Sequence, residues 1–373
     1  ALAHVLDEMQ RPVMPWFEFL AAMEQRFETQ GSVLHLPNAE LVAEFIAPNM
    51  TWQRDWAVEL LKHQRLPTES RLPGRVKKRL LWQAFSEWTY QSQRGRTLER
   101  VGKAVLAVPW GEVDAVAQEL LPRYQEHYGA QGLDQLTVTQ WLWGLLTHMR
   151  RRGAVMHPEL QHYAGDGNVF ALLKTAGRGE WLPSLLGRSP KPVFLTEGRQ
   201  RDFDKLSGQQ KATWYDRWAY AVLGQQALMR KGMAPEMAAD ALQALEKAAL
   251  LLRTDHHEGG TWALNPELLE LHTDVVFVAT QGSKRRLAVP RSMAEHLLGM
   301  PCLDAPESHY EVLIPDAISW WAQRYSQGDM RRVIAAEHTG LLERTAREEL
   351  ETRFKSKQPQ PWFENLLSAT PTL

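Results

Sequence analysis

The chain has 373 residues, of which 44% are hydrophobic and 23% are charged, and its formal net charge is −1. These values are ordinary for a globular protein of two or three domains, and any affinity for nucleic acid must come from local basic patches. No run approaches the roughly eighteen apolar residues of a membrane span. We expect no signal peptide, because the first residues show no basic region followed by an apolar one. The single cysteine, Cys302, excludes an internal disulfide framework and favours a cytoplasmic location.

Residues 1–200 are predicted to form a helical insertion or linker region. The clearest helical runs are Trp16 to Met23 and Glu40 to Ile46, separated by prolines, and their expected role is core packing. The fifteen tryptophans of the chain recur among Leu and Ala at helical spacing, so core anchors are the default interpretation for them.

A basic segment runs from 62 to 103, with eleven Lys and Arg residues against three acids. Such a stretch is often only a solvated face, but here the charge has one sign and aromatic residues interleave with it. Arg94 and Arg96 flank Gly95, and a glycine lets a backbone approach phosphates closely. Both interpretations stay open, with Arg94 and Arg96 as candidate DNA-binding residues.

Helical patterns fill Trp110 to Val155, and the last one ends in Arg150, Arg151, Arg152 and Gly153. A glycine stop after basic residues is typical of a helix C-terminus, where the dipole favours cations, although phosphate contact is an alternative role. The glycine- and proline-rich stretch from 163 to 201 predicts loops and an internal boundary. No G-x-x-x-x-G-K-[ST] phosphate loop occurs anywhere in the chain.

Residues 201–272 carry the pattern of a winged-helix domain. One helix is predicted over Trp214 to Leu228 and a second over Pro235 to Leu252, followed by a two-stranded wing that ends at Leu264. The second helix has few basic residues, so strand separation or duplex support is a more natural role than sequence readout. Inside helicases such domains often serve only as packing modules.

Residues 273–312 predict a hairpin, because Val275 to Ala279 and Arg286 to Val289 flank a glycine turn. We expect no metal site. His256 and His257 are adjacent on a polar turn without partners at ligand spacing, and one cysteine cannot supply a four-thiolate site.

Residues 313–373 predict a helix with Trp320 and Trp321, and then a strand–helix–strand unit. The apolar run Val333 to Ala336 is followed by a polar turn at His338 to Gly340. An amphipathic helix over Leu341 to Lys355 and a second apolar run over Leu366 to Thr370 complete the pattern. That order is the building block of a parallel α/β sheet.

A family resemblance lies in two sequence segments of this unit. They are Glu-His-Thr-Gly-Leu-Leu-Glu-Arg from 337 and Leu-Leu-Ser-Ala-Thr-Pro-Thr-Leu from 366. They resemble the second RecA-like motor domain of superfamily 2 helicases. The phrasing is most similar to large bacterial DEAD/DEAH-type DNA helicases related to the MrfA repair helicase and to the helicase subunit of Druantia anti-phage systems. Arg71, Arg75, Arg79 and Trp82 also look like the segment that follows the first motor domain in these proteins.

The resemblance implies a fold that is mainly α, with a winged-helix module and a partial RecA-like α/β unit at the C-terminus. It implies a degenerate zinc-ribbon-like segment at 273–312 and a truncated second motor domain at 313–373. The chain is then expected to be the middle of an ATP-dependent DNA helicase that acts in repair or phage defence. ATP and Mg²⁺ would serve the parent protein, and this segment alone, which lacks the phosphate loop, would be inactive.

The resemblance also implies which residues of this chain contact the DNA backbone. Free N–H groups at a helix start and arginines suit phosphate oxygens. The expected contacts are Gly340, Arg344, Arg347 and Thr370, with Arg75, Arg94 and Arg96 as weaker choices, and no catalytic residue is expected. The expected partner is DNA, single-stranded or at a duplex junction, and other defence-system subunits are a further option. The alternative is a non-enzymatic winged-helix adaptor that binds DNA or a protein.

Overall fold

The computed structural model describes residues 2–29, 72–166, 190–197, 202–208, 211–224, 233–256, 259–282, 285–315, 320–327, 335–338, 342–357 and 366–369. The predicted helix at 40–46 lies outside these ranges, as do residues 62–71 of the basic segment and most of the loop-rich stretch. The chain forms two compact units, a larger one (2–21 with 82–326) and a smaller one (22–81 with 327–373 and residue 1).

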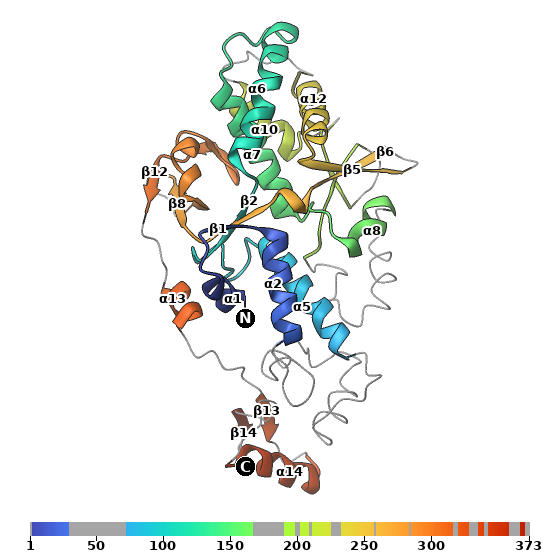
Figure 1. Cartoon of the computed structure of the whole chain (residues 1–373), viewed down its shortest axis with the longest axis vertical. Coiled ribbons are helices and arrows are strands. Elements are labelled where there is room, and N and C mark those ends of the chain that lie inside the picture. The colour runs from blue at the N-terminus through green and yellow to red at the C-terminus, as the bar shows by residue number, and fades with distance from the viewer. Residues whose placement is uncertain are drawn as a thin grey trace. The chain divides into compact units, whose positions relative to one another are not determined.

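Four helices form the helical group of the larger unit (Figure 1). They are α6 (Trp110–His127), α7 (Gln135–Arg152), α10 (Trp214–Val222) and α12 (Met233–Lys247). The central helix is α7, which is buried along most of its length. The side chain of Asp134 caps its first turn by accepting from the Thr137 N–H at 2.7 Å. Gly153 ends the helix in the left-handed conformation, with φ of 87°, as the sequence predicts.

Close contact between α7 and α10 depends on a glycine. The indole of Trp218 lies over Gly144, where an added Cβ would come within 2.1 Å of the ring. The Trp218 Nε1–H donates to the Trp141 carbonyl at 2.9 Å, so the buried indole keeps a hydrogen-bond partner. These two helices therefore pack through one tryptophan that fits only against a residue without a side chain.

Three short strands from distant parts of the sequence form one antiparallel sheet. Strand β7 (Glu270–His272) pairs with both β1 (Val13–Pro15) and β2 (Val105–Ala107). The sequence pattern predicts none of these strands, since each is only three residues long and its partners lie far away in the chain. They tie the N-terminal segment to the rest of the larger unit.

Three further sheets complete the larger unit. A four-stranded sheet has the order β4-β3-β6-β5, a three-stranded sheet has the order β12-β8-β9, and β10 pairs with β11. The strands are β3 (Leu195–Thr196), β4 (Asp204–Lys205), β5 (Leu251–His256), β6 (Gly259–Leu264), β8 (Val275–Ala279), β9 (Arg286–Pro290), β10 (Pro301–Cys302), β11 (Ala305–His309) and β12 (Val312–Ile314). The predicted hairpin over 275–289 is confirmed as β8 and β9.

The remaining helices are α1 (Leu2–Met9), α2 (Trp16–Thr29), α5 (Leu72–Trp88), α8 (Gln161–Asp166) and α13 (Trp320–Gln327). Short 3-10 turns lie at Pro158–Leu160, Pro266–Leu268, Arg291–Met293 and Glu295–Leu297. The described chain is thus a mixture of helices and small sheets, where the sequence predicts mainly α. Among the described residues, no helix combines the length and the apolar character that crossing a bilayer requires.

The predicted second helix of the winged-helix pattern is wrong at its end. It stops at Lys247, and the next residues turn into strand β5, which contains Leu252. Ala249 takes a positive φ of 56°, and the Leu250 N–H donates back to the Leu245 carbonyl at 2.9 Å. Apolar residues continue across this turn, so helical periodicity alone cannot locate it. The order helix, helix, hairpin is nevertheless present, with β5 and β6 as the hairpin.

Tryptophans form much of the core, as predicted. Trp16, Trp82, Trp88, Trp141, Trp218 and Trp262 are fully buried, whereas Trp320 is 59% exposed. Cys302 is also buried, and burial raises the pKa of its thiol to about 11.

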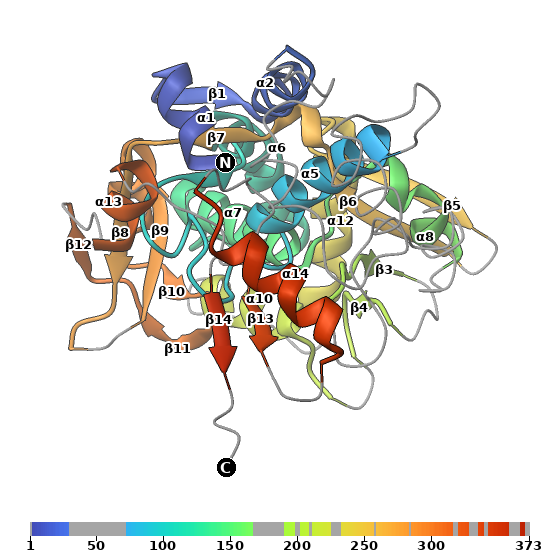
Figure 2. The ribbon, with the colours of Figure 1, turned by 90° about the horizontal axis from the view of Figure 1, so that it is seen from below.

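The smaller unit contains the predicted strand–helix–strand arrangement. Strand β13 (Ala335–His338) pairs in parallel with β14 (Leu366–Ala369), and α14 (Arg344–Phe354) connects them. Figure 2 shows the two strands side by side with the helix beside them. Val333 and Ile334 of the predicted strand lie outside the described residues, and the described strand includes His338, which the sequence places in the turn. The Nε2 of His338 lies 2.7 Å from Glu351 Oε1, so the strand end is bonded to the helix.

Candidate nucleic-acid interface

The two strands of the smaller unit end at the same edge. His338 pairs with Ala369 at that edge, which is the carboxyl end of both strands. The carboxyl edge of a parallel sheet is where α/β folds bind ligands. Gly340 and Thr370 follow the two strands in the sequence, but both lie outside the described residues.

Arg344 and Arg347 occupy the first turns of α14. Arg344 is exposed and its Nε donates to Glu348 Oε1 at 2.8 Å, one helical turn later. Arg347 is partly buried, and its backbone N–H donates to the Glu343 carbonyl at 3.0 Å. An exposed pair of this kind contributes about 0.3–0.5 kcal/mol, so a phosphate can compete for Arg344 at little cost. Both arginines thus begin the helix that follows the shared edge.

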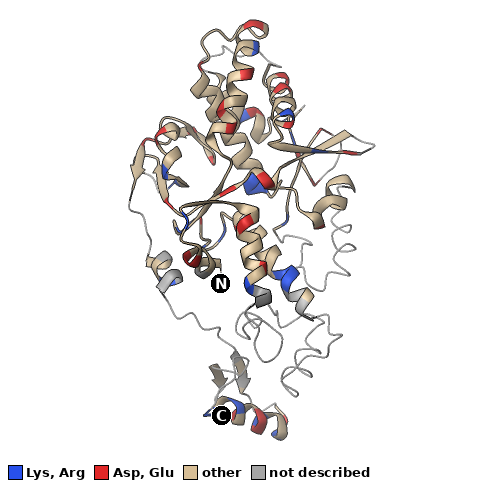
Figure 3. Cartoon of the chain, viewed as in Figure 1, with Lys and Arg blue, Asp and Glu red and all other residues tan. Residues whose placement is uncertain are grey.

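Acidic residues are interspersed with basic ones along α14 (Figure 3). Glu351 lies between Lys355 and His338, and the hydrogen bonds from Lys355 and then from His338 lower the pKa of its carboxyl. The helix as a whole is therefore not a basic surface, and any phosphate contact is confined to its first turns.

In the larger unit, the Gly95 loop presents Arg94 and Arg96 to solvent. Gly95 has a φ of 60°, and no atom lies within 4 Å of where its Cβ would be, so the tip is open. The loop is held from within: the Thr97 hydroxyl donates to the Ser92 carbonyl at 2.6 Å, and Arg100 donates to the Gly95 carbonyl at 2.7 Å. Two charged side chains therefore project from an anchored turn, as a phosphate contact requires.

Helix α13 adds aromatic side chains beside this loop. The guanidinium of Arg96 stacks over the Trp321 ring, 3.6 Å from its centroid, and Arg324 lies 5.5 Å from the Trp320 ring. Exposed aromatic rings with arginines suit nucleobases and the sugar–phosphate backbone. The sequence pattern predicts a core role for these tryptophans, and only the exposure of Trp320 in the structure distinguishes it.

The three arginines that end α7 have a structural role. Arg150 donates to Glu99 at 2.8 and 3.2 Å and also to the Trp88 carbonyl, and Arg151 donates to Glu99 at 3.2 Å. Burial acts to raise the pKa of Glu99, but the two arginines outweigh it and lower the pKa. Arg152 forms a two-bond ion pair with Asp204 at 2.7 and 2.9 Å. All three therefore bind protein carboxylates, which argues against the phosphate alternative for the group as a whole.

Helix α12, the reading helix of the winged-helix pattern, packs against α6. Arg123 pairs with Asp240 at 2.6 Å, and the Tyr124 hydroxyl donates to the Met237 carbonyl at 2.7 Å. Its apolar face is buried as well, including Ala238, Leu242 and Leu245. This geometry favours the packing role over insertion into a DNA groove.

Arg75 lies in α5, but its side chain is not among those described. Within the described ranges, no three His, Cys, Asp or Glu side chains gather as a metal ion would require.

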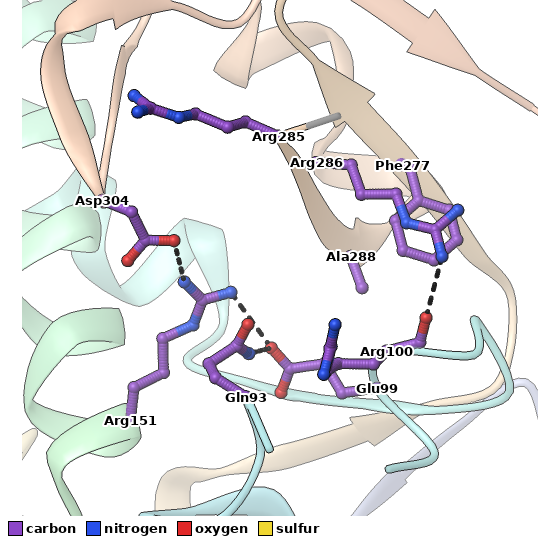
Figure 4. Close-up of a pocket in the computed structure, with 9 residues that line it drawn as sticks. All are labelled: Gln93, Glu99, Arg100, Arg151, Phe277, Arg285, Arg286, Ala288 and Asp304. Carbon is purple, nitrogen blue, oxygen red and sulfur yellow. Dashed lines mark hydrogen bonds and ion pairs between the residues drawn. The ribbon is translucent and has the colours of Figure 1, made fainter. Parts of the chain in front are cut away.

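A cavity that the sequence does not predict lies near the Gly95 loop (Figure 4). Four arginines line it from separate segments: Arg100 from the loop, Arg151 from α7, and Arg285 and Arg286 at the start of β9. Their separation in sequence, from 100 to 286, leaves no local motif that could have identified them.

No family model, no curated protein and no solved structure matches the chain.

Proposed function

We propose that the chain is part of an ATP-dependent DNA helicase or translocase of superfamily 2, and that this segment contacts the DNA backbone and couples its domains. The observation that carries the proposal is the parallel pairing of β13 and β14 through α14. The same part of the chain carries the two sequence segments that resemble the second motor domain of these helicases.

Two features of the larger unit add support. The Gly95 loop presents Arg94 and Arg96 on an open turn, and Arg96 stacks on Trp321. Guanidinium groups bind phosphate oxygens, and exposed rings such as Trp320 stack on bases of a single strand. The chain would in this way hold single-stranded DNA through its backbone and bases without reading sequence.

ATP and Mg²⁺ belong to the parent protein in this proposal. The residues present do not fit them, because the sequence has no phosphate loop and the described residues offer no carboxylate cluster for a metal ion. We therefore assign no step of ATP hydrolysis to this chain, whose own residues would bind and orient DNA.

The decisive experiment is DNA-stimulated ATP hydrolysis by the full-length gene product, with this segment as the negative control. We expect hydrolysis that rises with added single-stranded DNA in the full-length protein and none in the segment. Absence of ATPase activity in a folded full-length protein would instead favour the non-enzymatic adaptor.

A second measurement tests the α14 contact in the full-length protein. Arg347→Ala should weaken single-strand binding and lower the slope of log affinity against log salt by about one, because one phosphate contact is lost. Arg353→Ala, in the last turn of the same helix, is the matched control and should leave the slope unchanged. Equal slopes of log affinity against log salt for the wild type and Arg347→Ala would show that Arg347 of α14 does not contact a DNA phosphate.

A further inference from the structure

The arginine-lined cavity of the larger unit has a volume of about 280 Å³. Pockets for drug-sized ligands measure about 300–1,000 Å³, so this one suits a small group. Four arginines and two carboxylates line it, together with three other residues. The complete lining is Gln93, Glu99, Arg100, Arg151, Phe277, Arg285, Arg286, Ala288 and Asp304.

The Glu99 carboxylate does not make the floor of the cavity negative. Arg150 and Arg151 both bind it, and Gln93 donates to the same carboxylate at 2.7 Å. One negative charge is thus shared between two guanidinium groups, which leaves the buried trio with an excess positive charge. The oxygens of Glu99 accept hydrogen bonds from these donors, so the Glu99 side chain is a fixed part of the cavity wall.

Arg151 still has a donor without a partner. Its side chain is only 8% exposed, and its Nε is buried with no hydrogen-bond partner in the structure. Asp304, at 3.9 Å from the other side of the guanidinium, is 77% exposed and a weak partner. That nitrogen is inaccessible to solvent, so Arg151 contributes its positive charge to the cavity wall, and only the rim arginines can contact a bound group directly.

The rim adds three more guanidinium groups. Arg286 lies over the Phe277 ring at 4.4 Å from its centroid and donates to the Arg100 carbonyl at 3.3 Å. Arg100 uses one N–H for the Gly95 carbonyl. Arg285 reaches Glu307 at 3.6 Å, an exposed pair at the outside. Figure 4 shows the arginine side chains around the opening, from the loop, from α7 and from the start of β9.

We propose that this cavity binds a phosphate group. Arginine is the side chain whose planar N–H donors match phosphate oxygens, and like charges gathered around one space favour an anion between them. A phosphate presents several separate oxygen acceptors in a fixed tetrahedral arrangement, whereas chloride is a single spherical acceptor and an apolar ligand has none. Arg100, Arg285 and Arg286 line the cavity outside the buried ion pair of Glu99.

Two sources supply this chemistry, a phosphodiester of a nucleic-acid backbone and a free phosphate. The bond from Arg100 to Gly95 connects the cavity directly to the loop that carries Arg94 and Arg96. A strand held by those two arginines has further phosphates along its backbone, one of which can enter the cavity. The site is nevertheless independent of the helicase proposal, because free phosphate binding requires no nucleic acid.

The test is calorimetric titration of the chain with inorganic phosphate at constant ionic strength, with chloride as the balancing anion. We compare the wild type with the double variant Arg100→Gln/Arg286→Gln and with Arg286→Gln alone, which keeps the Arg100 bond to the loop. Arg217→Gln, an exposed arginine of α10 outside the cavity, is the matched control. Thermal unfolding establishes that each variant is folded.

The wild type and Arg217→Gln should bind phosphate alike, and the double variant should bind at least about ten-fold more weakly, equivalent to about 1.4 kcal/mol. Arg286→Gln alone should show a smaller loss in the same direction. No phosphate binding by the wild type beyond chloride, or equal binding by the folded cavity variants, would overturn the proposal. Displacement of bound phosphate by a thymidylate oligonucleotide assigns the site to backbone phosphates, and simultaneous binding of both assigns it to free phosphate.

Discussion

Two groups of arginines in the larger unit follow similar sequence patterns and have opposite environments. Arg150 and Arg151 precede Gly153 and are buried against Glu99, whereas Arg94 and Arg96 flank Gly95 and are exposed. Both glycines take a positive φ. The difference is the acidic partner: Glu99 lies 51 residues before Arg150 and becomes its neighbour only in the fold. Whether a basic cluster has a structural role or remains exposed to a ligand therefore depends on whether the fold places an acidic side chain from a distant segment beside it.

The largest expected effect comes from removing that partner. Glu99→Ala leaves Arg150 and Arg151 buried without their counter-charge, and we expect a loss of about 3–5 kcal/mol in the free energy of unfolding. Chemical denaturation of the chain measures it. Glu119→Ala, which breaks the exposed pair with Lys247, is the control and should cost at most about 1 kcal/mol. Equal losses in both variants would contradict the contrast between buried and exposed pairs.

Acid should reduce the same contribution in the wild type. The folded-state pKa of Glu99 is lowered below its ordinary value of 4.5, so its stabilisation is present above that pH and is lost as the pH falls through the folded pKa. The difference in unfolding free energy between wild type and Glu99→Ala should shrink in acid. His157 and His272, with pKa values lowered by burial to about 4, titrate in both proteins and cancel from the difference. A difference that stays constant down to low pH would show that Glu99 is not the titrating group.

The two glycines allow a smaller comparison. Gly153→Ala should destabilise by about 2–4 kcal/mol, because a Cβ there meets Pro192 Cα at 2.9 Å and the backbone is left-handed. Gly95→Ala meets no neighbouring atom, so only the backbone cost of about 1–2 kcal/mol applies. Urea unfolding of both variants checks the order, and a larger loss for Gly95→Ala would contradict the open loop tip.

Replacing the exposed arginines of the Gly95 loop should have the smallest effect on stability, although it should weaken DNA binding. Arg94→Gln/Arg96→Gln should change the free energy of unfolding by no more than about 1 kcal/mol, since both side chains are exposed and the lost contact is the stack of Arg96 on Trp321. The same variant should bind single-stranded oligonucleotides more weakly, with a salt slope lower by about two, because two phosphate contacts are lost. Binding measured over a salt series tests this. An unchanged slope would place these arginines with the solvated face that their sequence pattern also allows.

The sequence predicts features whose signal is local. Gly153 locates the end of α7, the turn around Gly282 locates the hairpin of β8 and β9, and two apolar runs locate β13 and β14. Periodicity fails at Ala249, because apolar residues continue through a turn into a strand.

Features that depend on distant neighbours are not predictable in this way. The sheet of β1, β7 and β2 joins three segments of three residues each, and none has enough residues for a pattern. The arginine-lined cavity likewise combines positions from 93 to 304. Trp320 has the same sequence character as the buried tryptophans, and its exposure follows only from the fold.

The environment of Cys302 has a practical consequence for studying the Gly95 loop. The reactive form of a cysteine is the thiolate, and Cys302 is both buried and, with a pKa of about 11, protonated at neutral pH. It is also the only cysteine in the sequence. A cysteine introduced at Arg94 or at Trp320 would consequently be alkylated selectively by a fluorescent or spin label, so the approach of a DNA strand to either position can be followed spectroscopically in a chain that keeps its native thiol.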